Sequence, residues 1–391
     1  MMNESTHENA TGGVGLHVEQ SIAGNYGDWT YFREQCIQGV IKKSIERYKE
    51  ALELGGLKSY SNLKTLYIGP AFHDNLGDNL LVLGSLHVLK WLNISVSMFC
   101  ADSQTTRFVD FCSDEKLLST CQPGKCFIYY HPGGNWGNIW GNKIQSYREH
   151  VIELGSHRGI TTISGPQTAY YLEGKPEKNL FDKRVNSSHA VLLWRQHDSF
   201  LLGRTLFHSL TSLEVPDAVF NLGVLTPYFR YEYDVAIHLR TDRESLLKYN
   251  KQMSPDSLCG DFRKLNYSCI VVSWHHPQFV KPNFKEGKMV YLTSVLNQAR
   301  AISSLGKVTI TDRLHGTIVP YLSQRAVIFL ESTSKKSSGV LQTALGDINV
   351  TFAENVSDVR NCYSGDYALI AATPNRKDVI MKVLELLKSW Q

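Results

Sequence analysis

Short apolar runs alternate with polar or glycine-rich segments along most of the chain, and helical periodicity follows nearly every run. The runs predict buried strands at KTLYIG (64–69), SVSMFC (95–100), KCFIYY (125–130), GITTIS (159–164), AVLLWR (190–195), DVAIHL (234–239), SCIVVS (268–273), KVTIT (307–311) and AVIFL (326–330). Because short apolar strands alternate with helices, we expect an α/β fold whose parallel sheets are covered on both faces.

Helical periodicity is clearest at residues 31–54 and 79–91, and the first of these helices should stop at Gly55-Gly56. A length of 391 residues suits two doubly wound domains better than one. We predict a flexible N-terminal segment at 1–28, an N-terminal α/β domain at 29–225, a C-terminal α/β domain at 226–374, and a last helix at 375–391 that packs on either domain or crosses back to the first.

Composition excludes several classes of protein. Hydrophobic residues make up 42% and charged residues 20% of the chain, as in globular proteins. The net charge of +4, from 41 basic and 37 acidic residues, gives no cationic surface of the kind that nucleic-acid binding needs. No run reaches the roughly 18 apolar residues of a membrane span, and the first 25 residues lack the pattern of a signal peptide. We therefore expect a soluble chain with no nucleic-acid partner.

Glycosylation sequons nevertheless favour a secretory lumen, with any membrane anchor absent from this sequence. Chance would give roughly three Asn-x-Ser/Thr sites. The chain has seven, at Asn3, Asn9, Asn93, Asn186, Asn266, Asn349 and Asn355. The eight cysteines form no Cys-x-x-Cys pair. One local disulfide among Cys112, Cys121 and Cys126 is one reading, and reduced core cysteines are the other.

Two loops at strand ends carry candidate binding residues. In GPAFHDNLGDNLL (69–81), Asp78 is placed to cap a helix that begins at Asn79. An anion or sugar hydroxyl would be held there by Asn75, Gly77, Asp78 and Asn79, unless the segment is an ordinary strand-to-helix turn. The spacing matches neither of the common nucleotide-binding motifs.

In YYHPGGNWGNIWG (129–141), the candidates are Gly133, Gly134, Asn135 and Trp136. Glycines let a backbone approach a ligand, and Trp136 or Trp140 could stack on a sugar ring. The alternative is that the tryptophans fill the space between the two domains.

Further charged residues follow other strands. Arg195 comes directly after a buried strand, where a guanidinium needs a carboxylate or phosphate partner. Arg240 has a similar place after the strand at 234–239. The adjacent His197 and Asp198 would point in different directions, and Asp217 after a proline is typical of a helix cap. No spacing of His, Cys, Asp and Glu, including His275-His276, resembles a metal site, so we predict no metal.

The segment TDRLHGTIV (311–319) is the strongest candidate site. In an extended turn, Arg313 and His315 would project to one side while Leu314 enters the core. Gly316 and Thr317 would then open a helix whose free amides add positive potential. Past the next strand, Ser332, Lys335 and Lys336 supply a hydroxyl and two cations. Together these residues predict a site for a small, multiply charged anion.

These segments resemble the polysaccharide pyruvyl transferases. The resemblance spans about 64–345, and it rests on NLGDNLL, PGGNWGN, GPQ, WRQHDS, VPDAVF and above all ITDRLHGTIVPYL. It implies two facing Rossmann-like domains similar to the GT-B glycosyltransferases, with the active site between them. It also implies phosphoenolpyruvate as donor, a galactose-containing oligosaccharide as acceptor, a cyclic ketal across O4 and O6 of the galactose, and no cofactor. The lumenal character is most similar to members of the fission-yeast type, which cap N-linked glycans in the Golgi and serve the cell wall.

The chemistry of ketal formation suggests roles for the candidate residues. Protonating an enol phosphate requires an acid that titrates near neutrality, so we predict His315 as the general acid and Arg313 as the residue that holds the donor. Donor-binding roles are predicted for Arg195, Arg240, Gly316, Thr317, Ser332, Lys335 and Lys336. Two alternatives are a glycosyltransferase that uses a nucleotide sugar and a non-catalytic glycan-binding protein.

Overall fold

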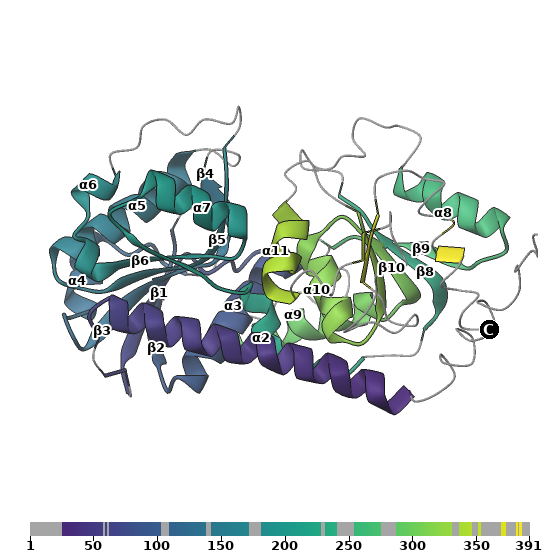
Figure 1. Cartoon of the computed structure of the whole chain (residues 1–391), viewed down its shortest axis with the longest axis horizontal. Coiled ribbons are helices and arrows are strands. Elements are labelled where there is room, and N and C mark those ends of the chain that lie inside the picture. The colour runs from purple at the N-terminus through teal and green to yellow at the C-terminus, as the bar shows by residue number, and fades with distance from the viewer. Residues whose placement is uncertain are drawn as a thin grey trace, which may run out of the picture.

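Two parallel β-sheets make up the framework of the protein, in a computed structural model (Figure 1). The structure describes residues 26–57, 59–60, 62–102, 109–137, 142–171, 181–227, 231–240, 254–274, 287–330, 336–345, 351–352, 369–372, 381 and 383–384. The predicted flexible segment at 1–28 and the last helix at 375–391 lie mostly outside these residues.

The first sheet has the strand order β2-β1-β3-β5-β6-β7, with β4 paired to β5. Its strands are β1 (Lys64–Ile68), β2 (Ser95–Cys100), β3 (Cys126–Tyr130), β4 (Gly133–Gly137), β5 (Thr162–Tyr170), β6 (Ala190–Trp194) and β7 (Thr211–Glu214). All pairs are parallel, and β1 aligns with β3 from Lys64 opposite Cys126 to Ile68 opposite Tyr130. The chain leaves β1 towards β2 and returns to β3 on the other side, so the order reverses between β1 and β3.

The second sheet has the strand order β12-β13-β11-β10-β8-β9. Its strands are β8 (Tyr233–His238), β9 (Cys269–Val271), β10 (Gly306–Thr311), β11 (Ala326–Leu330), β12 (Thr351–Phe352) and β13 (Leu369–Ala372). Here too every pair is parallel, and the order reverses between β8 and β10. Ligands of open parallel sheets bind beyond the carboxyl ends of the strands at such reversals.

Helices cover the sheets and fill the space between them (Figure 1). They are α2 (Tyr26–Leu54), α3 (Leu76–Trp91), α4 (Asp114–Thr120), α5 (Asn142–His157), α6 (Phe181–Arg184), α7 (His197–Leu206), α8 (Pro255–Lys264), α9 (Lys288–Ser303), α10 (Leu314–Leu322) and α11 (Lys336–Leu345), with the 3₁₀-helices η2 (Ser187–His189) and η3 (Ala218–Leu222). The long helix α2 runs alongside both sheets. It ends at Leu54 before Gly55-Gly56, as predicted, and Gly56 has a φ of 85°.

One apolar core joins the elements of both sheets. It contains Leu80 from α3, Leu292 from α9, Ile318 from α10 and Leu341 from α11, all fully buried. The two sheets are therefore packed together through their helices, and the predicted α/β fold with parallel sheets is confirmed. The predicted division at residue 225 stays a prediction.

Three disulfides lie among the described residues, and they overturn the expectation of reduced core cysteines. Cys100 pairs with Cys112, Cys121 with Cys126, and Cys259 with Cys269. Cys36 is also disulfide-bonded. The reading of one local disulfide among Cys112, Cys121 and Cys126 is confirmed by the Cys121–Cys126 pair. In each of the three pairs one cysteine lies in a strand and the other in a helix or loop beside it, an arrangement that no Cys-x-x-Cys spacing reports. None of the described helices combines the length and the apolar character that crossing a bilayer requires.

Candidate functional site

His315 lies in the first turn of α10, at the carboxyl end of β10. Arg313 is the N-cap residue, with extended φ and ψ of −100° and 127°, and Leu314 is buried as predicted. The expected extended turn therefore ends at Arg313, because the helix begins at Leu314 and not at Gly316 as predicted. The prediction that Arg313 and His315 project to one side stays a prediction. Gly316 is needed here, since a Cβ would lie 2.7 Å from Thr311 Oγ1.

The ring of His315 meets two elements of the first half of the chain. Its Nε2 lies 3.6 Å from Oδ2 of Asp217, and its side chain is only 11% exposed. Its Nδ1 packs against Gly77 in the first turn of α3, so closely that a Cβ at Gly77 would collide with it. Thus Gly77 is required for contact between the halves, and it lies in the first turn of α3.

Arg195 and Asp217 form a buried ion pair next to His315. Arg195 Nη1 donates to Asp217 Oδ2 at 2.6 Å, Arg195 Nε donates to Thr168 Oγ1 at 2.8 Å, and both charged side chains are at most 3% exposed. Burial alone would raise the pKa of Asp217, but the charges of Arg195 and His315 and the amide of Val219 hold it well below its usual range.

The predicted need of Arg195 for an anionic partner is met by this carboxylate. Asp217 caps η3 through Val219 N at 2.8 Å, as predicted, and it also faces the site. Sequence reasoning did not assign Asp217 to the site. The signal available was a buried arginine at a strand end, which requires an acid somewhere nearby.

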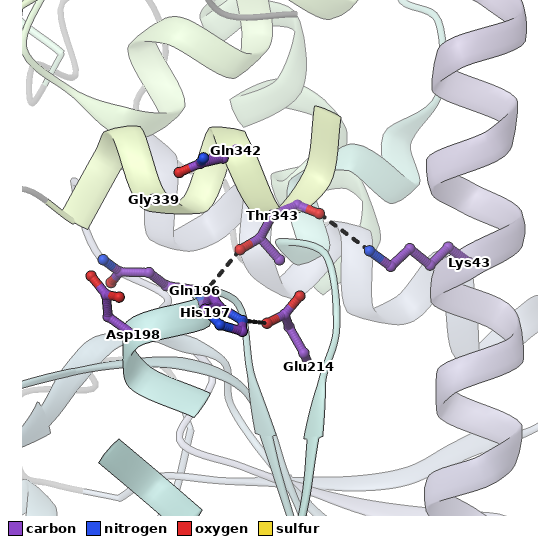
Figure 2. Close-up of a pocket in the computed structure, with 8 residues that line it drawn as sticks. All are labelled: Lys43, Gln196, His197, Asp198, Glu214, Gly339, Gln342 and Thr343. Carbon is purple, nitrogen blue, oxygen red and sulfur yellow. Dashed lines mark hydrogen bonds and ion pairs between the residues drawn. The ribbon is translucent and has the colours of Figure 1, made fainter. Parts of the chain in front are cut away.

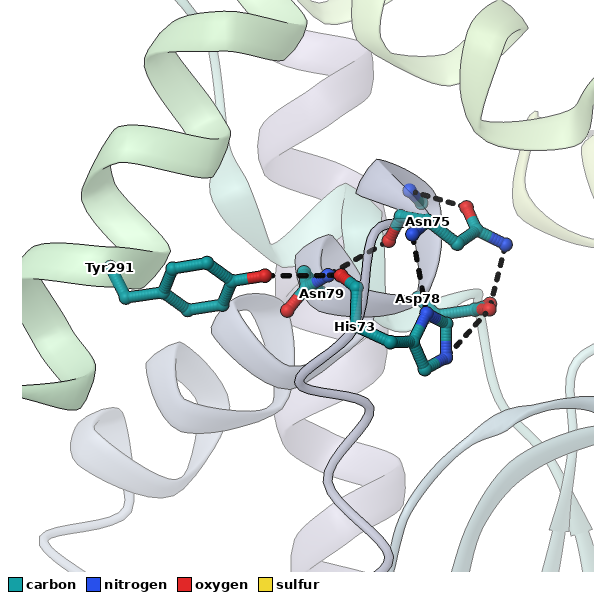
Figure 3. Close-up of polar contacts among 6 residues, drawn as sticks. His73, Asn75, Asp78, Asn79 and Tyr291 are labelled. Carbon is teal, nitrogen blue, oxygen red and sulfur yellow. Dashed lines mark hydrogen bonds and ion pairs between the residues drawn. The ribbon is translucent and has the colours of Figure 1, made fainter. Parts of the chain in front are cut away.

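The start of α3 forms the wall opposite α10, and Figure 3 shows its polar contacts. Asn75, and not Asp78, is the N-cap residue, because its Oδ1 accepts from Gly77 N at 3.0 Å. The helix therefore begins at Leu76 instead of Asn79. The fully buried Asn79 donates through Nδ2 to the carbonyl of His73 at 2.5 Å and of Asn75 at 2.9 Å, which ties down the segment before the helix.

Asp78 contributes negative charge at this helix start. Its Oδ2 accepts from Asn75 Nδ2 at 2.7 Å and lies 3.5 Å from His73 Nε2. Burial opposes its ionisation, but the charges of His73, His315 and Arg195 lower its pKa overall. Asp78, His315 and Arg195 therefore share one electrostatic environment.

The glycine and tryptophan segment is not the exposed loop that the sequence predicts. Residues 133–137 form strand β4, and Trp136 is fully buried against Trp194 and Phe207. Stacking of Trp136 on a sugar is therefore wrong, because the indole packs in an aromatic core instead. Trp140 lies outside the described residues. Asn135 Oδ1 accepts from Arg148 Nη2 at 2.6 Å, and Gly133 and Gly134 open the strand.

His131 lies between these glycines and β3, and sequence reasoning missed it. Its Nδ1 lies 2.9 Å from the hydroxyl of Tyr67, and burial lowers its pKa to about 3. It is a neutral histidine at the carboxyl end of β3, near the charges of Asp78 and Arg195. Its position at a strand end was the available signal.

Arg240, just after β8, lies beside the segment 311–319 that leads into α10. The backbone amide of Arg240 donates to Asp312 Oδ1 at 2.7 Å, and burial raises the pKa of Asp312 to about 6. Thr317 is fully buried and its hydroxyl donates to the carbonyl of Arg313 at 3.0 Å. Ser332 and Lys335 lie outside the described residues, as do His275, His276 and the side chain of Lys336.

A pocket of about 370 Å³ opens next to Arg195, between the first sheet and α11 (Figure 2). Its lining includes Lys43, Gln196, His197, Glu214 and Thr343. His197 Nδ1 lies 2.7 Å from Glu214 Oε2, and the His197 amide donates to Thr343 Oγ1 at 3.2 Å. The pocket therefore joins both halves of the chain. His197 pairs with Glu214 and not with Asp198, in keeping with the prediction that the two neighbours form no dyad.

The N-termini of α3 and α10 thus meet where the two sheets pack together, and Arg195 and His315 lie beside them. Helix N-termini and arginine favour anions, and an imidazole can move a proton at neutral pH. Within the described part of the chain, no group of three or more His, Cys, Asp and Glu side chains could hold a metal ion. The predicted independence of metals and cofactors stays a prediction.

The structure is thus an α/β protein in which His315 and the buried Arg195–Asp217 pair lie where two parallel sheets pack together. A family model described as polysaccharide pyruvyl transferase matches residues 75–334. The chain belongs to this family, and its activity class is therefore pyruvyl transfer on polysaccharides.

No curated protein sequence matches the chain. Among solved structures, the chain is similar to a functionally uncharacterised protein, KP1_0663, from Klebsiella pneumoniae subsp. pneumoniae NTUH-K2044. The two share 15% sequence identity with a TM-score of 0.48, over 77% of this chain and 95% of that one.

Proposed function

We propose that the protein transfers the pyruvyl group of phosphoenolpyruvate to a terminal galactose of a glycan, forming a cyclic 4,6-ketal and releasing phosphate. Family membership supports pyruvyl transfer. The choice of catalytic residues rests on the position of His315, which lies in the first turn of α10 and packs against the first turn of α3. An anionic donor at this point would be held by helix amides and by Arg313.

In the proposed reaction, the imidazolium of His315 gives its proton to the methylene carbon of phosphoenolpyruvate. The electron pair of the double bond forms the new C–H bond and leaves C2 cationic. One galactose hydroxyl bonds to C2, and its proton returns to His315. The second hydroxyl then replaces phosphate, whose C–O bond breaks with its electron pair and which takes the remaining proton. No further cofactor enters this sequence.

The disulfides and sequons favour a secretory compartment. Disulfides persist in oxidising compartments and are rare in the cytosol. The sequon residues Asn93, Asn186 and Asn266 are all exposed in the folded chain. We therefore place the protein in the lumen of the secretory pathway, with the Golgi as the compartment and N-linked glycans of the cell wall as acceptors, as in the fission-yeast type.

A GT-B-like arrangement follows from the same proposal. Domains at 29–225 and 226–374 would each contain one sheet, and donor and acceptor would meet where the strand order reverses in both. Contacts between the halves, such as Tyr291 Oη to the His73 carbonyl at 3.0 Å, support an active site at this junction.

The test is to replace the two proposed catalytic residues and to measure pyruvyl transfer from phosphoenolpyruvate to a β-galactoside. His315→Ala and Arg313→Ala should each lower kcat/KM roughly 30- to 1000-fold, because a charged partner of the transition state is lost. Matched controls are His150→Ala and Arg184→Ala, which remove exposed members of surface ion pairs. Transfer by both site variants at rates near those of the controls would refute the assignment.

A further inference from the structure

The ring of His315 is held in place by residues from the other half of the chain. The ring is nearly buried, with one nitrogen towards Asp217 and the other against Gly77. These neighbours belong to the first half of the chain, whereas His315 belongs to the second. Its orientation is therefore set across the junction between the two halves.

We propose that Asp217 is the positioning residue for His315: it holds the Nε2 edge of the ring and so fixes the ring against Gly77 at the start of α3. This inference rests on the proposed function. Asp217 itself is fully buried and touches no open surface, so it acts through His315 and not on the substrate.

Asp217 is fixed by three contacts before it meets the histidine. Arg195 holds one carboxylate oxygen, Val219 N holds the other, and η3 is packed so tightly on α3 that a Cβ at Gly84 would collide with the carbonyl of Ala218. A carboxylate held in this way cannot follow the ring, so the ring must orient towards the carboxylate. Such pre-organisation is what a proton-transferring group needs.

The separation of Nε2 and Oδ2, 3.6 Å, permits an ion pair but is longer than a hydrogen bond. Catalytic contacts of this kind often tighten when substrate binds. Asp78 from α3 is the other carboxylate that the charge of His315 reaches, while Arg195 lies behind Asp217.

A double-mutant cycle tests this role. Asp217→Asn keeps the acceptor for Val219 N and removes the charge, so kcat should fall about 10- to 100-fold while KM for the galactoside changes less than about threefold. In a His315→Ala background, the same replacement should change kcat less than about threefold, because there is no ring left to position. Asp114→Asn, which breaks the exposed Asp114–His150 pair, should leave kcat unchanged.

Asp217→Asn leaves Arg195 buried without a charged partner, so a second variant is required that spares this pair. Gly77→Ala pushes the ring from its place, and it should lower kcat by at least about tenfold when assayed well below the melting temperature of the variant. Gly260→Ala is its control, since nothing lies within 4 Å of a Cβ there.

The outcomes separate this inference from the proposed function. An unmodified enzyme that ignores phosphoenolpyruvate contradicts the function. The positioning role is overturned by an active enzyme in which Asp217→Asn costs as much in the His315→Ala background as it does with the histidine present. It is equally overturned if Gly77→Ala keeps full kcat.

Discussion

At the scale of single residues, the site contains two kinds of buried carboxyl group. One has a cationic partner, and the other is buried without enough compensation for its charge. Asp217 meets Arg195 at 2.6 Å and stays ionised, whereas Asp312, 2% exposed, is held beside β10 with its pKa raised to about 6. A carboxylate with a raised pKa costs stability at neutral pH, and such residues concentrate at functional sites. Asp312 is thus a residue whose burial disfavours the folded state.

Replacing Asp312 by Asn should therefore stabilise the protein at pH 7.5. The folded state keeps a proton on Asp312 up to about pH 6, whereas an ordinary Asp loses it near pH 3.8. Stability is then lost as pH rises through this window, and Asn, which never ionises, should recover about 1–3 kcal/mol above it. Its Oδ1 can still accept from Arg240 N.

Urea unfolding at pH 4 and pH 7.5 measures this difference. The two proteins should be closest in stability at pH 4. Asp234→Asn is the control of opposite sign, because burial opposes but Lys307 and Ser268 together lower the pKa of Asp234. An Asp312→Asn protein less stable than the parent at pH 7.5 would show that the carboxylate is a favourable partner.

Some residues of the candidate site could be predicted from the sequence, and others could not. Arg195 was identifiable because a charge directly after an apolar strand needs an explanation, and Arg313 because it lies two residues before His315 near a strand end. Trp136 was misplaced because glycines around an indole look the same in an exposed loop and in an edge strand packed on Trp194. The contact of Asp217 with His315 spans about a hundred residues of sequence, and no local pattern reports such a contact.

At the scale of elements, the turns after β1 and β10 bring α3 and α10 together. The strands were predictable from apolar runs, but both helix starts were placed too late. Asn75 caps α3 three residues before the expected Asp78, and α10 begins at Leu314. Both Asp and Asn favour the N-cap position, so local preference alone could not choose between them. The contact of α3 with η3 then fixes Asp217.

Enlarging Gly84 should separate α3 from η3. In Gly84→Ala the new methyl group meets the carbonyl of Ala218, so one element must move, at a cost of about 1–3 kcal/mol. Because Asp217 precedes Ala218, kcat should fall as well. Gly39→Ala in α2 meets nothing within 4 Å and serves as the control. Melting temperature and kcat are measured together, and a variant unchanged in both would disprove the close packing.

At the scale of the whole molecule, the two sheets share one apolar core, and the candidate site lies where they meet. Buried, neutral histidines lie in both halves: His131 follows β3, and His238 ends β8 against Trp274. Burial lowers the pKa of each to about 3, with Arg313 adding to the effect at His238. The unfolded chain takes up these protons below about pH 6.5 and the folded chain does not, so acid should destabilise both halves over the same range.

Replacing His238 by Phe should weaken this acid sensitivity. Each such histidine lowers the free energy of unfolding by about 1.4 kcal/mol per pH unit below 6.5, or about 2 kcal/mol at pH 5. Phe keeps the ring and cannot take a proton. Among the described residues neither nitrogen of His238 has a hydrogen-bond partner, so none is lost. Urea midpoints from pH 7.5 to 5 should fall less steeply in the variant, and parallel curves would argue against a neutral His238.

The most direct measurement is to incubate the unmodified protein with phosphoenolpyruvate and a terminal β-galactoside, following product mass and free phosphate together. A pyruvyl transferase yields a galactoside heavier by one pyruvic acid less one water, with one phosphate released for each product molecule. Saturable turnover of a nucleotide sugar instead, or galactoside binding with phosphoenolpyruvate left intact, would contradict the proposal.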